Sequence, residues 1–440
     1  MDNRNDNAGM YLLLFHLIAI PSICALLLAA LTLCGVNIPL LTGEPLEGSR
    51  EQTFSIKEAI PPGEAERLRS LQEEMLRRSN SEGDDTDSAS KTENADSEEQ
   101  AETLWVYPGS QIIGDDDDAV TFTFAGDLLL DPYYATGSTA QSIGLAACFD
   151  DASLSVMRDS DIFVVNNEFP YTDSNVPQEN KQFTFHAPPS AAAMLNDIGA
   201  DLALLANNHM YDYKAIGVTD TVNALDAAGI PHIGAGRNIA EASRPQVYTI
   251  HSENAEPFTV AIINATQVEQ YATPNTLPAT ESDPGVFRCF DPALLYSTIE
   301  QTKAAVDFVI VTVHWGTEKE EEIQYLQADQ AQGMVAHGAD LIIGGHPHIL
   351  QPIEYVNGVP VVYSLGNYLF TSYLLDTGVV RITLQPSTRS LASLQFIPML
   401  QDNCHVRTAD GAEKDRILQY VQNMSRGIVI DGEGFVRPAQ

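Results

Sequence analysis

Short apolar runs, each ending in small or polar residues, recur between residues 120 and 345 and limit the folds open to this chain. The runs are rich in Val, Ile and Leu, and stretches of helical character, such as 216–230 and 328–339, separate some of them. Near-continuous apolar strands that alternate with helices are typical of an α/β sheet covered on both faces. The later runs 358–370 and 378–386 follow without such helices, so we expect them to be antiparallel additions.

Charge and cysteine usage exclude two kinds of site. The 440 residues carry a formal net charge of -37, so we do not expect a surface that binds nucleic acid or anionic lipid. The five cysteines show no CxxC or Cys/His finger spacing, which argues against a zinc site made of thiolates.

The first 117 residues depart from the strand pattern. We expect a short cytoplasmic N-terminus at 1–9 and a transmembrane anchor at 10–35, because the apolar stretch there carries no formal charge and is long enough for a bilayer core of about 30 Å. A cleaved signal peptide is the alternative, although no clear small-x-small cleavage site follows. Residues 36–117 include the acidic segment 80–102, which has too few apolar side chains to fold, and we expect a largely disordered stalk.

The charges near the apolar stretch bear on where the rest of the chain lies. Neither Lys nor Arg occurs between the predicted span and Arg50, which favours a single-pass protein of the cell membrane with an extracytoplasmic main domain. We predict that this domain covers 118–400 and that 401–440 is a C-terminal extension packed on it.

Polar side chains follow several of the apolar runs where the strands are expected to end. Taken singly, a glycine-aspartate pair is typical of a turn or cap, and a lone histidine is typical of a core position. Together they should converge, because the carboxyl ends of parallel strands lie at the same edge of a sheet. The candidate metal ligands are Asp127, Glu168, Asn208, His314, His346 and His348.

These side chains fit a site for one or two divalent ions. Oxygen and nitrogen ligands without thiolate favour manganese, iron or zinc. Glu168 could bridge two ions about 3.5–4 Å apart, the arrangement of two-metal hydrolysis. His209 is expected to donate a proton to a leaving group or to stabilise charge on the reacting anion. Asp212 either orients His209 or caps a helix.

Seven short motifs follow one another along the main domain: FAGDLLL, NNEFP, FTFHAPP, LLANNHMYDY, VHWGTE, GGHPHILQPIEY and YSLGNYLF. In these motifs and their order the chain resembles CapA/PgsA-type proteins of poly-γ-glutamate capsule biosynthesis, and the resemblance covers 120–400. The resemblance implies a calcineurin-like metallophosphatase fold, a four-layer α/β/β/α sandwich in which the candidate ligands and His209 form a two-ion centre. It also implies a membrane-anchored protein that acts outside the cell on an anionic polymer or a phosphoester, with other capsule-synthesis membrane subunits as partners.

The chain also departs from the pattern of these relatives. Leu129 stands where the superfamily usually has a histidine, so one metal position is expected to be weaker or empty. His186 replaces an arginine of the family, and the arginine expected shortly after the first aspartate is missing, which should weaken binding of phosphate or carboxylate. The remaining candidates for substrate binding are Asn166, Asn207, His186, Glu318 and Asn367.

Two functions remain open at this point. The first is a metal-dependent hydrolase or transferase, which the intact His209 favours. The second is a non-catalytic accessory subunit that binds or guides an anionic polymer, which the missing ligand at Leu129 favours.

Overall fold

The computed structural model describes residues 110–113, 119–252, 255–268 and 276–439. The predicted N-terminus, anchor and most of the predicted stalk lie outside these residues. In the part that the structure describes, every helix is too short or too polar to cross a bilayer. Residues Ser110–Ile113, at the end of the predicted stalk, form strand β1, which pairs in parallel with β7 (Gln246–Ser252).

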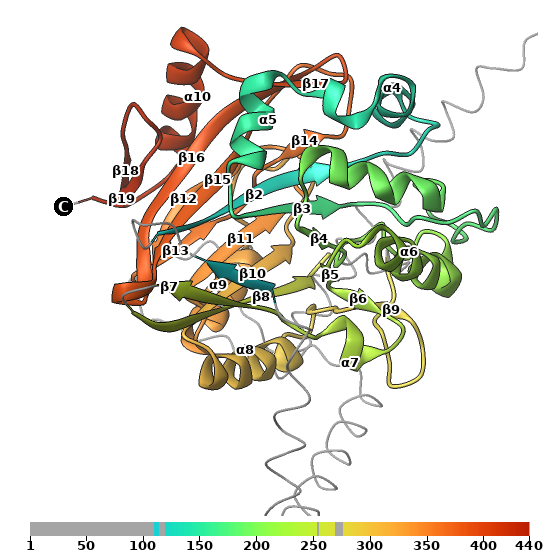
Figure 1. Cartoon of the computed structure of the whole chain (residues 1–440), viewed down its shortest axis with the longest axis horizontal. Helices are drawn as coiled ribbons and strands as arrows, with labels where there is room; N and C mark the ends of the chain where they lie inside the picture. The colour runs from blue at the N-terminus through green and yellow to red at the C-terminus, as the bar shows by residue number, and fades with distance from the viewer. Residues whose placement is uncertain (1–109, 114–118, 253–254, 269–275, 440) are drawn as a thin grey trace, which may run out of the picture. The chain divides into compact units, whose positions relative to one another are not determined.

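Two sheets lie at the centre of the fold (Figure 1). In spatial order, the first sheet contains β1, β7, Ala255–Thr266 (β8), Phe308–His314 (β10), Leu341–Gly345 (β11), Val359–Val362 (β13) and Ile353–Val356 (β12). The second contains His405–Thr408 (β17), Ser390–Asp402 (β16), Leu375–Gln385 (β15), Val120–Leu128 (β2), Ile162–Asn167 (β3), Leu202–Leu204 (β4) and His232–Ile233 (β5), and Asn367–Leu369 (β14) also pairs with β2.

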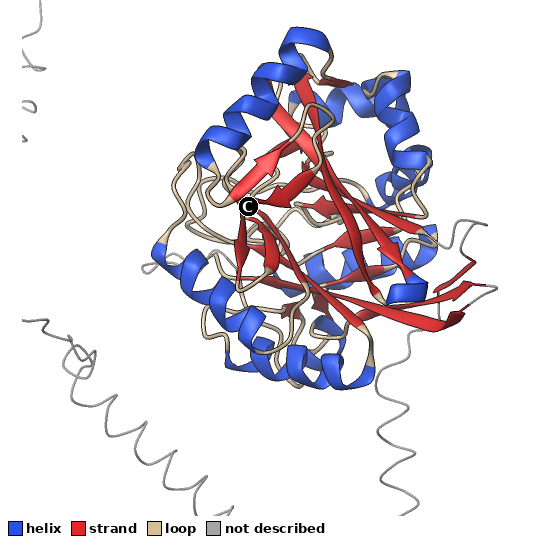
Figure 2. Ribbon diagram, turned by 90° about the vertical axis from the view of Figure 1, so that its left-hand side faces the viewer, coloured by secondary structure: helices blue, strands red, loops and turns tan. Residues whose placement is uncertain are grey.

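Helices cover the outer face of each sheet (Figure 2). Those against the second sheet are Ala135–Ile143 (α4), Leu145–Cys148 (η3), Asp151–Arg158 (α5), Pro189–Ile198 (η4) and Lys214–Ala228 (α6). Those against the first are Ala293–Ala305 (α8) and Tyr325–Ala336 (α9). Smaller elements are Ala235–Gly236 (β6), Ile239–Ala242 (α7), Gly285–Val286 (β9), Pro386–Thr388 (η5), Ile428–Ile430 (β18) and Val436–Pro438 (β19).

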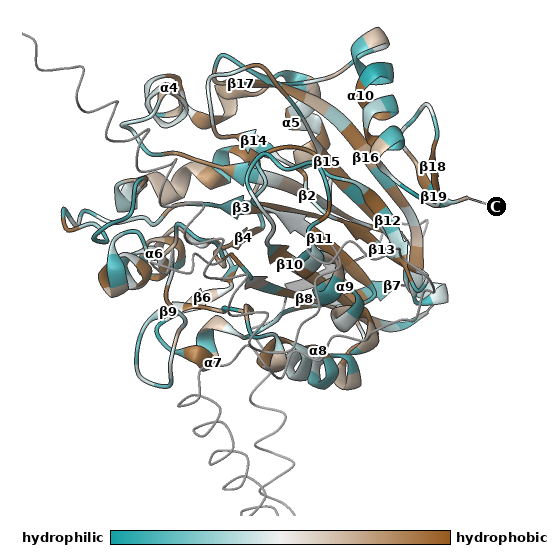
Figure 3. Cartoon of the chain, turned by 180° about the vertical axis from the view of Figure 1, so that it is seen from behind, coloured by the Kyte–Doolittle hydropathy of each residue, from teal (hydrophilic) through white to brown (hydrophobic). Residues whose placement is uncertain are grey.

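A continuous apolar core joins the inner faces of the two sheets. Phe122 and Val164 of one sheet belong to the same buried cluster as Ile262 and Ile310 of the other. The helix Gly411–Met424 (α10) contributes Ile417, Leu418 and Val421 to this cluster. Figure 3 shows these strands as mainly hydrophobic, as expected for strands covered on both faces. The prediction of an α/β fold is therefore confirmed, and its layers run helix, sheet, sheet, helix.

The antiparallel direction predicted for the late runs is confirmed for β15 and only in part for the run that contains β13 and β14. β13 is antiparallel to β12 but parallel to β11, and β14 runs parallel to β2. The reason for β13 lies in the strand order. Because β12 occupies the edge of the sheet, the hairpin that follows it returns β13 alongside β11 in the parallel direction.

Gly126 allows β2 to approach the segment that precedes β14. A Cβ atom added to Gly126 would lie 2.0 Å from the carbonyl oxygen of Gly366, and the amide of Asp127 donates a hydrogen bond to that oxygen at 3.0 Å. The close approach therefore fixes the backbone of Asp127, a candidate ligand.

We expect Gly126→Ala to lower the free energy of unfolding by about 2–3 kcal/mol, because backbone on both sides would have to move. Urea denaturation measures this change. Gly432→Ala is the matched control, since a Cβ atom there meets no atom within 4 Å. Equal unfolding midpoints for the two variants would contradict the prediction.

Candidate metal centre

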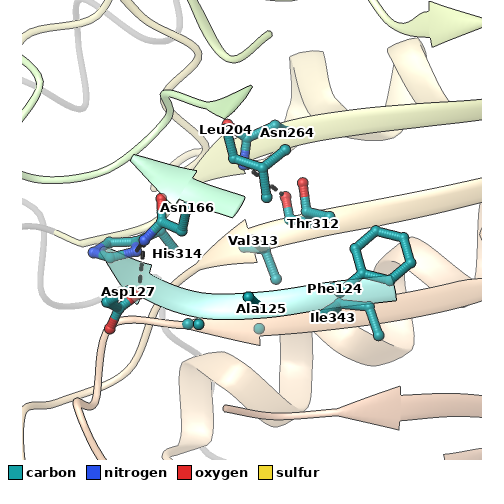
Figure 4. A pocket seen from close by; sticks show the side chains of 13 residues that line it. Phe124, Ala125, Asp127, Asn166, Leu204, Asn264, Thr312, Val313, His314 and Ile343 are labelled. Atoms are coloured by element: carbon teal, nitrogen blue, oxygen red, sulfur yellow. Dashed lines mark hydrogen bonds between the residues drawn. The ribbon is translucent and has the colours of Figure 1, made fainter. Parts of the chain in front are cut away.

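The six candidate ligands lie together, but they come from the strand ends of two facing sheets and not from one sheet edge. Asp127 lies in β2 and Glu168 directly after β3, and Asn208 lies in the turn four residues after the end of β4, and these three strands belong to the second sheet. His314 ends β10 of the first sheet, and His346 and His348 follow β11. Figure 4 shows two of them, Asp127 and His314, near the ends of their strands with Asn166 between them. All six side chains are buried or nearly so.

The Nε2 atom of His314 is the centre of one group of potential ligands. It lies 2.8 Å from Asn208 Oδ1, 3.2 Å from His346 Nδ1 and 3.3 Å from Glu168 Oε1. Ligand atoms that surround one ion at about 2.1 Å are about 3.0–3.4 Å apart. These atoms are therefore spaced closely enough to be ligands of one divalent ion.

Asp127 and His348 form a second group of potential ligands next to Glu168. Asp127 Oδ2 is 3.0 Å from His348 Nδ1, and His348 Nε2 is 3.9 Å from Glu168 Oε1. The ligand atoms also form two sets of three, each within 4.8 Å of one another: one is Asp127, Glu168 and His314, and the other is Glu168, His346 and His348. Glu168 belongs to both sets. Leu129 is buried and offers no ligand atom. The site is therefore asymmetric, with fewer protein ligands beside Asp127 than beside His314.

The turn that carries the last two histidines has an unusual backbone. His346 and His348, on either side of Pro347, have φ angles of 99° and 60°. Such angles cost non-glycine residues about 1–3 kcal/mol each and are concentrated at functional sites. The amide of Lys319 donates a hydrogen bond to the carbonyl of Pro347 at 2.8 Å and so ties the loop after β10 to this turn.

The electrostatics of the cluster favour a bound cation. Neither carboxylate oxygen of Glu168 has a hydrogen-bond partner among the described residues, and burial together with the charge of Asp127 raises the pKa of Glu168 well above its usual value. For Asp127 burial also raises the pKa, but the hydrogen bond and charge of His348, the charge of His314 and the hydrogen bond from Asn166 together leave that pKa lowered. Burial without a compensating ligand is costly for carboxylates, and a divalent ion would supply one.

The histidines of the cluster are suited to the same role. Burial lowers the pKa of His314 to about 3 and lowers the pKa of His346 well below its usual value, with the neighbouring histidines adding to the effect. Both rings are therefore neutral, the form in which imidazole binds metal. The residues present thus fit a divalent ion of the manganese, iron or zinc type.

His209 and Asp212 form a pair beside the cluster. His209 Nδ1 lies 2.8 Å from Asp212 Oδ2, and the His209 ring packs against Phe185 with ring centres 4.2 Å apart. The N-cap of α6 is Tyr213, so the interpretation of Asp212 as a helix cap is wrong. The geometry is that of a carboxylate orienting an imidazole.

The five candidates for substrate binding have different surroundings. Asn166 donates to Asp127 Oδ1 at 2.7 Å, and Asn207 donates to the carbonyl of Asn167 at 2.9 Å and accepts from the amide of His209 at 3.1 Å. These two amides therefore hold the site together. Asn367 is opposite Asp127 in the sheet, and its Oδ1 is buried without a hydrogen-bond partner in the described part of the chain.

The other two candidates lie in loops. Glu318 is exposed, and its charge contributes to raising the pKa of Glu168. His186 is partly exposed, and its amide donates to Asp131 Oδ2 at 2.9 Å. A role of any of the five in substrate binding stays a prediction.

Two buried residues near the site were not identified from the sequence. Lys181 contacts Asp212, and no motif in its surroundings marks it. Asn264 lies between the sheets under the cluster, where Oδ1 accepts from the amide of Ala206 at 2.7 Å. It lines a cavity of about 20 Å³ with Leu204 and Thr312, room for about one water (Figure 4). An asparagine inside an apolar strand was the available signal for Asn264.

Comparison with known proteins gives consistent matches. The family model described as bacterial capsule synthesis protein PGA_cap matches residues 121–372. The PGA biosynthesis protein CapA of Bacillus subtilis is 30% identical over 281 residues, which cover 64% of this chain and 68% of that protein. The capsule biosynthesis protein CapA of Bacillus anthracis is 28% identical, with 71% and 75% covered.

A more distant relative and one solved structure complete the comparison. A probable polyglutamine synthesis accessory protein of Mycobacterium tuberculosis is 25% identical, with 61% of this chain and 73% of that protein covered. Among solved structures, a phosphatase from Mycoplasma pneumoniae is 13% identical with a TM-score of 0.40, covering 65% of this chain and 95% of that one.

Proposed function

This chain belongs to the family of bacterial capsule synthesis proteins, and we propose that it acts in the synthesis or export of poly-γ-glutamate or a similar anionic envelope polymer, using a divalent-metal centre. The observation that carries the metal centre is the state of Glu168. Its two oxygens are buried without hydrogen-bond partners in the described chain, and it belongs to both sets of potential metal ligands.

The chemistry that this centre supports best is hydrolysis or transfer at a phosphoester or at the γ-linked amide of polyglutamate. A bound ion would polarise the reacting centre and lower the pKa of water. The chain's own contribution comes from His209, which would donate a proton to the leaving group while Asp212 keeps its ring in place. The buried ligand side chains at the strand ends, together with Asn208 from the turn after β4, would hold the ion and so fix where the reacting group binds.

A non-catalytic accessory subunit that binds or guides an anionic polymer is the second candidate. The specific observation in its favour is Leu129, which leaves the position beside Asp127 with fewer protein ligands. The mycobacterial relative carries the name of an accessory protein. In this function the ions would bridge the protein to carboxylates of the polymer, and other capsule-synthesis membrane subunits would carry out the chemistry.

We also propose that 10–35 anchors the chain in the cell membrane with the main domain outside the cytoplasm. The uncharged apolar composition of this stretch supports the proposal. Protease added to intact cells without a wall should then digest the main domain. Protection of that domain until the membrane is opened would contradict the location.

Elemental analysis of the purified full-length chain tests the metal centre. We expect about two manganese, iron or zinc ions per chain in the wild type and near-complete loss in His346→Ala/His348→Ala. His337→Ala is the control, because His337 packs on Tyr296 of α8, away from the cluster. About one ion in the wild type would identify the position beside Leu129 as empty and favour polymer binding. A folded wild-type protein without metal would contradict the metal centre.

A further inference from the structure

Residues 172–186 form a loop that leaves the second sheet after β3 and returns before η4 with its ends together. The amide of Thr172 donates to the carbonyl of Ala187 at 2.8 Å, and the amide of Ala187 donates to the carbonyl of Pro170 at 3.0 Å. A compact surface loop of this length with closed ends is an Ω-loop, a type that is often functional.

The inner side of this Ω-loop is fastened to the turn 207–212, which carries Asn208 and His209. The amide of Gln178 donates to the carbonyl of Asp212 at 2.7 Å, and the amide of Phe185 donates to Asp212 Oδ2 at 2.7 Å. The ring of Phe185 packs on His209. The loop therefore contacts the turn through main chain and through an aromatic side chain.

Lys181 makes the contact that reaches furthest into the site. Its side chain is only 7% exposed, and Nζ donates to Asp212 Oδ1 at 2.5 Å and to the main-chain carbonyl of Asn208. One ammonium group thus joins the carboxylate that orients His209 to the backbone of a candidate metal ligand. Hydrogen bonds of this charge-assisted kind are short and strong, and they restrict geometry.

We propose that Lys181 is a positioning residue of the metal centre, which fixes the turn 207–212 so that the amide oxygen of Asn208 faces the ion held with His314. The distance of 2.8 Å between Asn208 Oδ1 and His314 Nε2 shows the alignment that the lysine would maintain. The inference rests on the proposed metal function. It assigns to the Ω-loop the task of supporting a ligand that the strands alone do not hold.

A purely electrostatic role predicts the opposite effect. A positive charge near a cation site disfavours the cation, so removing it would strengthen metal binding if charge alone mattered. A positioning role predicts weaker binding, because groups that orient metal ligands typically contribute 10–100-fold to affinity. The sign of the change therefore separates the two.

The experiment titrates Co²⁺ into metal-free full-length protein, with calorimetry for affinity and visible absorption for the ligand geometry. We expect Lys181→Met to raise the dissociation constant of the Co²⁺ ion bound at His314 by about 10–100-fold and to change the visible absorption spectrum of bound Co²⁺. Lys303→Met is the matched control. Lys303 likewise donates to one carboxylate, Asp340 Oδ2 at 2.7 Å, and to one main-chain carbonyl, that of Asp307 at 2.7 Å. It should leave affinity and spectrum unchanged.

Lys181→Gln keeps a hydrogen-bond donor but removes the charge. This variant replaces Lys181→Met in the titration if circular dichroism shows that Lys181→Met does not fold. Its affinity should lie between those of the wild type and Lys181→Met. Unchanged or tighter Co²⁺ binding with the wild-type spectrum in a folded Lys181 variant would overturn the positioning role and leave the metal centre intact. A wild-type protein that binds no Co²⁺ would overturn both.

Discussion

Changing Glu168 to glutamine is expected to abolish tight divalent-metal binding and, in metal-free protein, to raise the stability of the fold. Both sets of potential ligands include Glu168, so the substitution removes one charged ligand from each position at once. Without metal, the carboxyl is buried next to Asp127 and its oxygens have no hydrogen-bond partner among the described residues. At neutral pH the wild type must either keep this buried carboxyl charged or protonate it, and both cost free energy relative to the unfolded chain. A neutral amide of nearly the same shape avoids that cost, with a gain of about 1–3 kcal/mol.

Adding metal should therefore reverse which of the two proteins, the wild type or Glu168→Gln, is the more stable. In EDTA the glutamine variant should melt at a higher temperature than the wild type. With Mn²⁺ at about 1,000 times its dissociation constant, the wild type should gain about 4 kcal/mol and become the more stable protein, because only the native state binds the ion. Thermal unfolding followed by circular dichroism, with and without metal, measures both orders.

Glu300→Gln is the control for this experiment. Glu300 lies on α8 with its side chain 63% exposed, and its nearest ion-pair partner is His337 at 3.8 Å. The control should not alter the response to Mn²⁺. The same gain from Mn²⁺ in Glu168→Gln as in the wild type would show that Glu168 is not a shared ligand.

The candidate ligands could be predicted from the sequence because the signal was local. Each follows or ends an apolar run whose composition indicated a β-strand. Polar side chains at the ends of several such strands indicate a shared site more strongly than a series of unrelated turns. The division of the runs between two facing sheets was not visible in the runs themselves. β3 and β10 have the same apolar pattern, yet they belong to different sheets and deliver Glu168 and His314 from opposite sides.

Other features depended on contacts that no local pattern encodes. Lys181 lies in a polar loop, and its partner Asp212 is 31 residues away, so neither the composition nor the spacing of the loop marks it. The direction of β13 depends on which neighbour occupies the sheet edge. The role of Asp212 was ambiguous, because an aspartate just before a helix fits a cap equally well. The N-cap of α6, which is Tyr213, and the contact of Asp212 with His209 decide between the two interpretations.

Changing His209 to glutamine should separate the two functions proposed for this protein. The side-chain amide of glutamine can still donate to Asp212, so the turn and the neighbouring ligand Asn208 should keep their places and the metal content should stay unchanged. Glutamine cannot deliver a proton to a leaving group, so we expect turnover to fall by about 10²–10⁴-fold. The assay is release of product from simple phosphoesters and from γ-linked polyglutamate, with metal content measured on the same samples.

His405→Gln is the control, since His405 is an exposed histidine of β17 whose Nδ1 lies 2.9 Å from the carbonyl of Asn403. It should turn over substrate like the wild type. Equal turnover by His209→Gln and the wild type would exclude His209 as the proton donor. Two results together would favour the accessory function. The wild-type protein would bind two ions but hydrolyse neither substrate, and His209→Gln would bind the polymer with the same affinity as the wild type. In that case the buried pair of His209 and Asp212 would serve to support Asn208, since the two side chains lie on the same turn as this ligand.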